Sequence, residues 1–327
     1  MKKIGFVIPC FPVLSETFVG VQIRSVQSIG HPISIYAFEG HSHYQPLDEI
    51  LYQQCQYLSP SDPYSIKQLL FSTHRCHSFL QQQSGFSYLS LLKQGMQLAH
   101  RVAKDGCDHL HAHFAWHSAA TAIVAAKALN ISISFVTHGD DVYLNPQDLN
   151  EKLENTHFVC AVTRKMQSEL QVQTKTPIHH LPCGIELNHY KNQLSHWSTK
   201  PKRFIFIGRL VEKKGIDILL QALSQSSQTI DIDIVGDGPL LNELQNTVEE
   251  KKLQKVHFLG NKTADWLNTH ANQYQALIVP FKIAQNGSQD AAPLVIKEAM
   301  MLGIPIITTN LAGCNEMLPH TPLNKFK

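Results

Sequence analysis

Short apolar runs that alternate with helical stretches constrain the fold of this chain most strongly. Residues 4–8 form a continuous apolar run, which is typical of a strand buried on both faces of a sheet. A helix is expected to follow from Ser15, its N-cap, to about Ile29, and a second strand is expected over residues 33–38. A strand, a helix and a second strand in this order predict an α/β fold.

Further runs of this kind lie on either side of a polar segment. Residues 191–202 are polar and lack hydrophobic periodicity, so we expect the linker between two domains there. The length of 327 residues also fits about two domains. We therefore predict an N-terminal domain over residues 1–190 and a C-terminal domain over residues 203–327. Residues 40–105 show a weaker pattern of secondary structure, and we expect them to be mostly helical after Pro63.

Composition excludes several classes of protein. The formal net charge of +2 gives no reason to expect nucleic-acid binding. No apolar run approaches the roughly 20 residues of a membrane span, and the apolar part of the N-terminus is too short for a signal peptide. The seven cysteines are scattered without a Cys-x-x-Cys pair, which favours reduced thiols in a cytoplasmic protein.

The run over residues 290–305 predicts a loop followed by one short helix. Pro293 suits the first helical position, and Gly303 suits the left-handed position that ends a helix. Asp290 lies just before the helix, where free N–H groups favour an anion, while Glu298 lies inside an apolar helix and needs hydroxyls or cations as partners. This combination suits a ligand with phosphate and sugar hydroxyls. A surface helix with a solvated Glu298 is the alternative.

A basic loop over residues 208–215 follows the strand expected at residues 203–207. Its Arg209 and Lys214 offer a guanidinium fork and a point charge that can neutralise a diphosphate, although a solvated basic loop is equally compatible with the sequence. The later Gly-Asp-Gly at residues 236–238 lacks the third glycine of a dinucleotide-binding fingerprint, so that signal is weak.

Histidines mark two predicted strands of the first half. His109, His111 and His113 alternate and therefore point to one face. Zinc binding is the less favoured interpretation, because no acidic or cysteine ligand is obvious nearby and histidines at strand ends commonly line polar clefts. The strand over residues 131–136 ends close to His138, at the edge where α/β sheets bind ligands. An ordinary turn is the alternative there.

Several segments together resemble glycosyltransferase family 4, whose members have the GT-B fold. In the second half the resemblance rests on residues 208–215, residues 235–239 and the run over residues 290–305. In the first half, three segments resemble the bacterial exopolysaccharide branch with its colanic-acid-type enzymes: residues 11–18, 111–114 and 137–143. A fourth segment, residues 182–186, resembles the family's turn before the linker. Their order and spacing match over most of the chain except residues 40–105.

The resemblance implies two Rossmann-like domains that face each other across a cleft. It also implies a hexosyl-type transferase that moves a sugar from a nucleotide sugar to a growing surface glycan, such as lipopolysaccharide, or to a lipid-linked acceptor, with retention of configuration. Neither a metal nor another cofactor is expected. A lipid-linked acceptor would bring this otherwise cytoplasmic protein into peripheral contact with the inner face of the membrane.

The resemblance also implies roles for single residues. Arg209 and Lys214 would hold the donor diphosphate and stabilise it as it leaves, and Asp290 would contact the donor sugar. His138 would lie near the transferred bond, and Glu298 would hydrogen-bond the ribose. The other donor-side candidates are Gly208, Pro293 and the backbone N–H groups of Leu294 and Val295, and the acceptor-side candidates are Ser15, Glu16, His113 and Asp141.

Three departures from the family pattern bear on function. Asp290 is one methylene shorter than the usual glutamate, and Ala291 stands where a glycine is usual. The chain ends soon after residues 313–316, whereas the family continues with further helices, so the second domain is expected to be incomplete and to expose apolar surface. The alternative function is therefore a truncated, inactive remnant or partner subunit that binds a nucleotide sugar without turnover. The paired acids disfavour a third possibility, a sugar-nucleotide epimerase.

Overall fold

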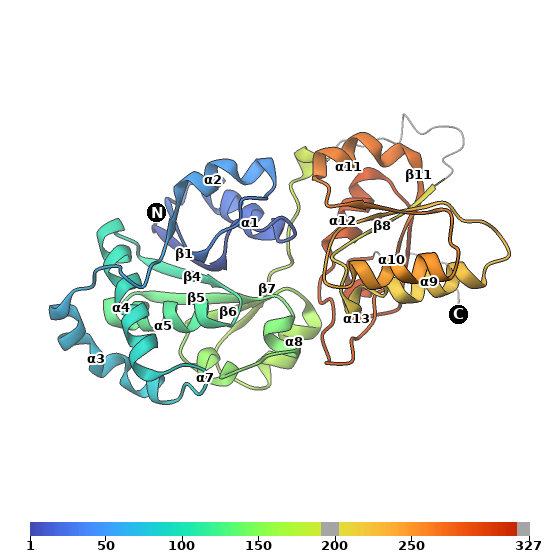
Figure 1. Ribbon diagram of the computed structural model, residues 1–327. Coiled ribbons are helices and arrows are strands. Elements are labelled where there is room, and N and C mark those ends of the chain that lie inside the picture. The colour runs from blue at the N-terminus through green and yellow to red at the C-terminus, as the bar shows by residue number, and fades with distance from the viewer. Residues whose placement is uncertain (191–202, 319–327) are drawn as a thin grey trace. The chain divides into compact units, whose positions relative to one another are not determined.

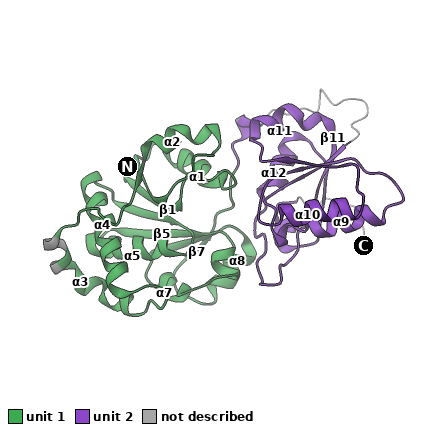
Figure 2. Ribbon diagram, viewed as in Figure 1, with its two compact units in different colours: residues 1–184 green, residues 185–327 purple. Residues whose placement is uncertain are grey.

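The computed structural model describes residues 1–190 and 203–318 (Figure 1). The chain forms two compact units, unit 1 over residues 1–184 and unit 2 over residues 185–327 (Figure 2). The boundary lies between Gly184 and Ile185 rather than at residue 190, and Tyr190 is buried in the core of unit 2. The linker expected over residues 191–202 lies outside the described residues.

Unit 1 is built on a parallel sheet of seven strands in the order β3-β2-β1-β4-β5-β6-β7. The predicted α/β architecture is confirmed, and the run over residues 4–8 lies within the first strand. The strands are β1 (Ile4–Cys10), β2 (Ile33–Glu39), β3 (Cys55–Tyr57), β4 (His109–His113), β5 (Ser132–Thr137), β6 (Phe158–Ala161) and β7 (Ile178–His180).

Helices cover both faces of this sheet (Figure 1). The first helix begins at Thr17, so the prediction that Ser15 is its N-cap is wrong. The N–H of Glu16 bonds the carbonyl of Val13, so a turn occupies these residues and Glu16 takes the cap position. The helices are α1 (Thr17–Ser28), α2 (Glu49–Gln54), α3 (Ile66–Gln81), α4 (Tyr88–Asp105), α5 (His117–Leu129), α6 (Asp140–Tyr143), α7 (Leu149–Glu154) and α8 (Arg164–Gln171).

Unit 2 is built on a parallel sheet of five strands in the order β10-β9-β8-β11-β12. Its strands are β8 (Arg203–Ile207), β9 (Ile232–Val235), β10 (Val256–Gly260), β11 (Tyr274–Val279) and β12 (Ile306–Thr308). Its helices are α9 (Ile216–Gln225), α10 (Leu241–Glu250), α11 (Ala264–His270), α12 (Leu294–Leu302) and α13 (Ala312–Met317). One continuous apolar core joins the sheet to these helices.

In each sheet the chain adds strands on one side of the first strand and then continues on its other side. In unit 1 this switch lies between β1 and β4, and in unit 2 it lies between β8 and β11. Ligands of open α/β sheets bind outside the carboxyl ends of the strands at such a switch point. The loops that follow these four strands are therefore where a site is expected.

Two expectations from composition can be compared with the described residues. All seven cysteines are free thiols. Within residues 1–190 and 203–318, no helix is both long enough and apolar enough to cross a bilayer.

Candidate functional site

An ion pair joins two loops at the switch point of unit 2. Lys214 lies in the loop after β8, and its Nζ is 2.5 Å from Oδ2 of Asp290, in the loop between β11 and α12. The side chains are only 15% and 17% exposed, so both charges are largely removed from water. The ammonium also lies 5.0 Å from the ring centre of Phe281. Lys214 is therefore paired within the protein, and not simply solvated.

Backbone contacts that only glycine permits hold this edge of the sheet together. Gly215 has a φ of +68°, and a Cβ there would lie 1.8 Å from the carbonyl oxygen of Pro280. A Cβ on Gly236 would lie 1.9 Å from the carbonyl oxygen of Gly208. The loops after β8, β9 and β11 thus pack backbone against backbone. Gly236, the first glycine of the Gly-Asp-Gly at residues 236–238, therefore lets the loop after β9 pack against the loop after β8.

A matched pair of glycine substitutions tests this packing. Gly260 has a φ of +67°, almost the same as that of Gly215, but a Cβ on Gly260 would meet no atom within 4 Å. Gly260→Ala should therefore cost only about 1–2 kcal/mol of unfolding free energy for the left-handed backbone. Gly215→Ala should cost clearly more, because its Cβ would also collide with the carbonyl oxygen of Pro280. Denaturant unfolding measures both variants, and equal losses would contradict the proposed packing.

Arg209 lies in the same loop and differs from Lys214 in its surroundings. Its side chain is exposed, and no hydrogen bond or ion pair is found for it within the part of the chain that the structure describes. A guanidinium in this state can bind an incoming anion without first breaking a contact inside the protein.

The helix α12 begins beside Asp290. Pro293 occupies the N-cap position and Leu294 begins the helix, so the prediction of a proline at the first helical position is one residue off. The first N–H groups of a helix, here those of Leu294 and Val295, have no partner within it and carry its positive dipole end. Gly303 ends the helix with a φ of +72°, as predicted. The loop and helix thus form a feature that favours an anion.

Glu298 has the partners that its place in an apolar helix requires. Its Oε1 accepts a hydrogen bond of 2.9 Å from the hydroxyl of Tyr190. Burial raises the pKa of Glu298, while this hydrogen bond and the charge of Lys214 act against the rise. The predicted need for a hydroxyl or a cation is confirmed. Sequence reasoning missed Tyr190, because an aromatic residue beside a polar segment carries no signal of a partner so distant in the chain.

Ala291 is accommodated where the family pattern has glycine. Its side chain is buried, with 8% exposed. The close approach at this point is instead made by Gly313 in α13, where a Cβ would lie 2.3 Å from the carbonyl oxygen of Ala291 and 2.6 Å from that of Asp290. Gly313 therefore lets α13 support the loop that carries Asp290.

A pair of histidines lies at the carboxyl ends of β4 and β5 in unit 1. Nδ1 of His113 is 3.2 Å from Nε2 of His138, and the two rings are stacked with 8° between their planes. Phe18 and Phe114 flank His138 at 4.4 Å and 4.5 Å between ring centres. Burial lowers the pKa of His138 to about 3, so its imidazole is neutral near pH 7.

Asp141 is a fully buried carboxylate that holds the backbone of this loop. It accepts hydrogen bonds from the N–H groups of Ala115, His138 and Gly139 at 2.8, 2.9 and 2.8 Å. Burial raises the pKa of Asp141, and these backbone bonds oppose the rise. This geometry gives Asp141 a structural role, since it fixes the backbone on which His138 stands.

The other candidates of unit 1 lie in less enclosed surroundings. Ser15 is exposed and Glu16 is half-buried in the loop that leads into α1. Burial raises the pKa of the neighbouring Cys10 thiol to about 11, with the charge of Glu16 as a further cause. Ser15 and Glu16 lie between the carboxyl end of β1 and the start of α1, on one side of the switch point.

The other two histidines of β4 have protein partners. His109 bonds the hydroxyls of Ser132 and Ser134 at 2.7 and 2.8 Å, and His111 bonds Ser134 at 2.8 Å and Gln22 at 3.0 Å. Burial lowers the pKa of both imidazoles, that of His109 to about 4. These contacts occupy the ring nitrogens of both histidines within the protein, which argues against the zinc interpretation.

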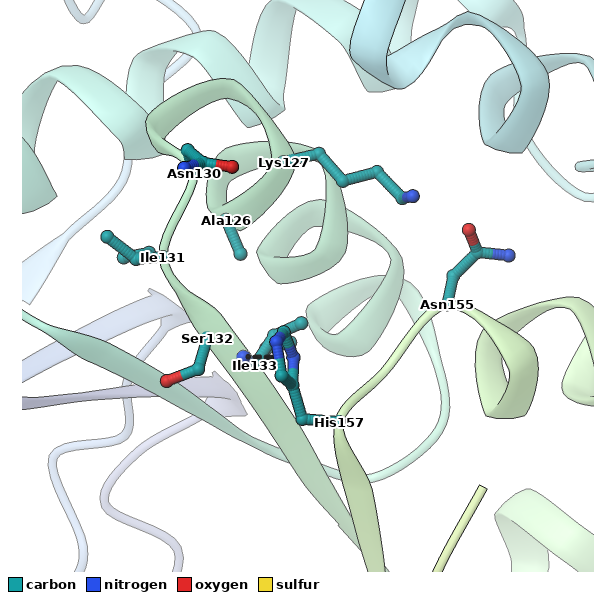
Figure 3. Close-up of a pocket in the computed structure, with 8 residues that line it drawn as sticks. All are labelled: Ala126, Lys127, Asn130, Ile131, Ser132, Ile133, Asn155 and His157. Carbon is teal, nitrogen blue, oxygen red and sulfur yellow. Dashed lines mark hydrogen bonds between the residues drawn. The ribbon is translucent and has the colours of Figure 1, made fainter. Parts of the chain in front are cut away.

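Two further features lie at the opposite, amino-terminal edges of the sheets. Asp231, Asp233 and His257 could together hold a metal ion by their spacing, but the guanidinium of Arg203 lies 3.5 and 3.4 Å from the two carboxylates. That cluster is therefore a network of ion pairs. A pocket in unit 1 is lined by residues from the end of α5, the start of β5 and the segment before β6 (Figure 3): Ala126, Lys127, Asn130, Ile131, Ser132, Ile133, Asn155 and His157.

Comparison with known proteins identifies similar sequences over almost the whole chain. Residues 201–324 match the family described as glycosyl transferases group 1. The chain is 24% identical to the amylovoran biosynthesis glycosyltransferase AmsK of Erwinia amylovora, over 97% of this chain and 85% of that protein. It is 20% identical to the putative colanic acid biosynthesis glycosyltransferase WcaL of Escherichia coli, over 97% of this chain and 84% of that protein.

Solved structures with the same fold cover as much of the chain. HepE of Anabaena, crystallised with UDP-glucose, has a TM-score of 0.71 and 17% identity over 98% of this chain and 84% of its own. The lipopolysaccharide outer core galactosyltransferase WaaB has a TM-score of 0.61 and 17% identity over 94% of this chain and 80% of its own. At this level of identity the likeness concerns the fold.

Proposed function

We propose that this chain, which has the GT-B fold, is a glycosyltransferase of family 4 and that it transfers a hexose from a nucleoside-diphosphate sugar. The acceptor is a growing surface glycan or a lipid-linked saccharide, and the configuration of the sugar is retained. The observation that carries this proposal is the meeting of Lys214, Asp290 and the N-terminus of α12 at the switch point of unit 2.

The electrostatics of this site suit a departing diphosphate. When the bond between the sugar and the phosphate breaks, negative charge develops on the phosphate oxygens. Lys214 and the N–H groups of Leu294 and Val295 offer fixed positive charge that stabilises this state, and the exposed guanidinium of Arg209 can add to it. Cations and a helix dipole that are already in position cost little reorganisation at the moment of reaction, which favours the transition state over the bound donor.

The nucleotide end of the donor is assigned to Glu298. A carboxylate at this position can accept hydrogen bonds from the ribose hydroxyls, and Tyr190 holds one of its oxygens. Asp290 is assigned to the donor sugar, whose arrival would replace its contact with Lys214. Gly208 has no side chain that would keep the donor from the backbone after β8, and Pro293 directly precedes the free N–H groups of α12.

The names of the relatives favour particular donors and products. HepE was solved with UDP-glucose, so a UDP-sugar is the first donor to test. AmsK and WcaL are named for amylovoran and colanic acid, which favours an exopolysaccharide as the product. We propose that the reaction takes place in the cytoplasm, or at the inner face of the membrane if the acceptor carries a lipid.

Unit 1 is assigned to the acceptor and the transferred sugar. We propose that His138 acts as a neutral hydrogen-bonding group, since its low pKa excludes a charged imidazole near pH 7. Ser15 and Glu16 remain candidates on the acceptor side, whereas His113 is fully buried and can contribute there only through His138.

The experiment that tests the proposal uses the purified full chain. It is incubated with a panel of UDP-, GDP-, TDP- and ADP-sugars, with and without lipid-linked saccharides, and the release of nucleoside diphosphate is measured. Release with one donor class is the expected result. Binding without release, for example by calorimetry, would favour the alternative of a nucleotide-sugar-binding protein without turnover. Neither binding nor release across the panel would refute the proposal.

A conservative change at Tyr190 tests the assignment of Glu298. Tyr190→Phe removes the hydroxyl that bonds Oε1 and should raise the KM for the donor about fivefold, equivalent to about 1 kcal/mol, with little change in kcat. Tyr44→Phe is the matched control, because it removes a hydrogen bond of 2.7 Å to Glu49 in unit 1. Steady-state kinetics with varied donor measures both, and an equal effect of the two variants would argue against the assignment.

A further inference from the structure

The stacked pair of His113 and His138 must share its hydrogen bond in one of two ways. His113 is fully buried, and burial lowers its pKa well below the ordinary value, as it lowers that of His138. Both imidazoles are therefore neutral near pH 7, and each carries one N–H and one lone pair. Across the 3.2 Å contact, either Nδ1 of His113 or Nε2 of His138 is the donor.

The surroundings of His113 discriminate between the two arrangements. Its Nε2 is buried and has no hydrogen-bond partner among the residues that the structure describes. If His138 were the donor, the proton of His113 would have to reside on this Nε2, as a buried N–H without an acceptor, at a cost of about 1–3 kcal/mol. If His113 is the donor, only a lone pair is left on this Nε2. Buried acceptors without a partner are tolerated better than buried N–H groups.

We propose that His113 is a positioning residue, which donates from Nδ1 to Nε2 of His138 and thereby fixes His138 as its Nδ1–H tautomer. The Nδ1–H of His138 then faces Sγ of Cys183 at 3.8 Å. Sulfur is a weak acceptor, so this N–H keeps its capacity to donate to an oxygen of a substrate. That the oxygen belongs to a sugar rests on the proposed function, whereas the tautomer does not.

The tautomer can be read directly from the ring nitrogens. In protein labelled with ¹⁵N-histidine, long-range ¹H–¹⁵N spectra distinguish a protonated nitrogen from one that carries a lone pair. Because the chain has 19 histidines, the signals of His138 are assigned by their loss in His138→Gln. We expect a protonated Nδ1 and an unprotonated Nε2 at neutral pH. The opposite pattern in the wild-type protein would overturn the proposal.

Two variants of His113 test its part in this choice. The amide of asparagine places an N–H donor close to the position of Nδ1, so His113→Asn should keep the tautomer of His138. His113→Leu has no donor, so it should give a mixture of both tautomers and lower turnover about tenfold, more than His113→Asn does. His109→Asn is the matched control, since His109 is a half-buried histidine of the same strand that hydrogen-bonds Ser132 and Ser134. A His138 spectrum that is unchanged in His113→Leu would refute the role of His113.

The two kinds of failure are distinguishable. If the spectra show the expected tautomer but no donor is turned over, the proposed function fails and the inference about His113 holds. If donors are turned over but Nε2 of His138 is protonated, the inference fails alone. Should His113→Leu not fold, the wild-type spectrum and that of His113→Asn still decide the question.

Discussion

Replacing Lys214 by alanine is expected to reduce the release of nucleoside diphosphate by about 10²–10³-fold. The ammonium group lies at the switch point of unit 2, where the donor phosphate is proposed to bind, and it is largely shielded from water. A fixed charge in such a place stabilises a departing phosphate far more than an exposed one does. Single-turnover measurement with saturating donor isolates the chemical step from donor binding.

The control for this variant is Lys213→Ala, which removes the neighbouring positive charge. A loss confined to Lys214→Ala would separate the specific contact from the general charge of the loop. Lys214→Ala also leaves the carboxylate of Asp290 without its cation, so thermal unfolding must be followed in parallel. A folded Lys214→Ala protein with unchanged turnover would rule out the proposed role.

Replacing Asp290 by asparagine is expected to change binding and turnover in opposite directions. In the ligand-free protein Asp290 neutralises Lys214, so a phosphate must compete with this carboxylate for the ammonium. Asp290→Asn removes that competition and should tighten the binding of a nucleoside diphosphate about three- to tenfold. Because the proposed contact to the donor sugar is weakened at the same time, turnover should fall about a hundredfold.

Calorimetry with the free nucleoside diphosphate and kinetics with the matching donor measure the two effects. Asp237→Asn is the control, since Asp237 is an exposed carboxylate in the loop after β9, at the same edge of the sheet. Its replacement should leave both quantities nearly unchanged. Weaker diphosphate binding in Asp290→Asn would show that the ion pair assists the phosphate rather than competing with it.

The elements of unit 2 were predictable where their signals are local. The strand over residues 203–207 has the predicted bounds, and the helix over residues 294–302 ends at the predicted Gly303, although it begins one residue later than predicted. An apolar run and a terminal glycine define these bounds without reference to the rest of the chain. By contrast, the start of α1 was misplaced, since the turn at Val13 and Glu16 that precedes it carries no composition signal. The short strand β3 was missed for the same reason.

For the candidate site, the kinds of contact that its residues need could be predicted, but the residues that make those contacts could not. Glu298 required a hydroxyl or a cation, but that hydroxyl comes from Tyr190, 108 residues away in the chain. The pairing of Lys214 with Asp290 likewise depends on which strands become neighbours in the sheet. Asp141 was an acceptor-side candidate because of its motif, whereas its hydrogen bonds to three backbone N–H groups became visible only in the folded chain.

The glycine contacts at Gly215 and Gly236 also affect how the donor preference of such a protein could be engineered. The loops after β8, β9 and β11 touch through backbone atoms, so a change in the path of one displaces the next. A chimera that imports a single loop would create steric overlap at these contacts wherever that loop carries a side chain in place of the glycine. Transplanting all three loops together would keep their mutual contacts intact.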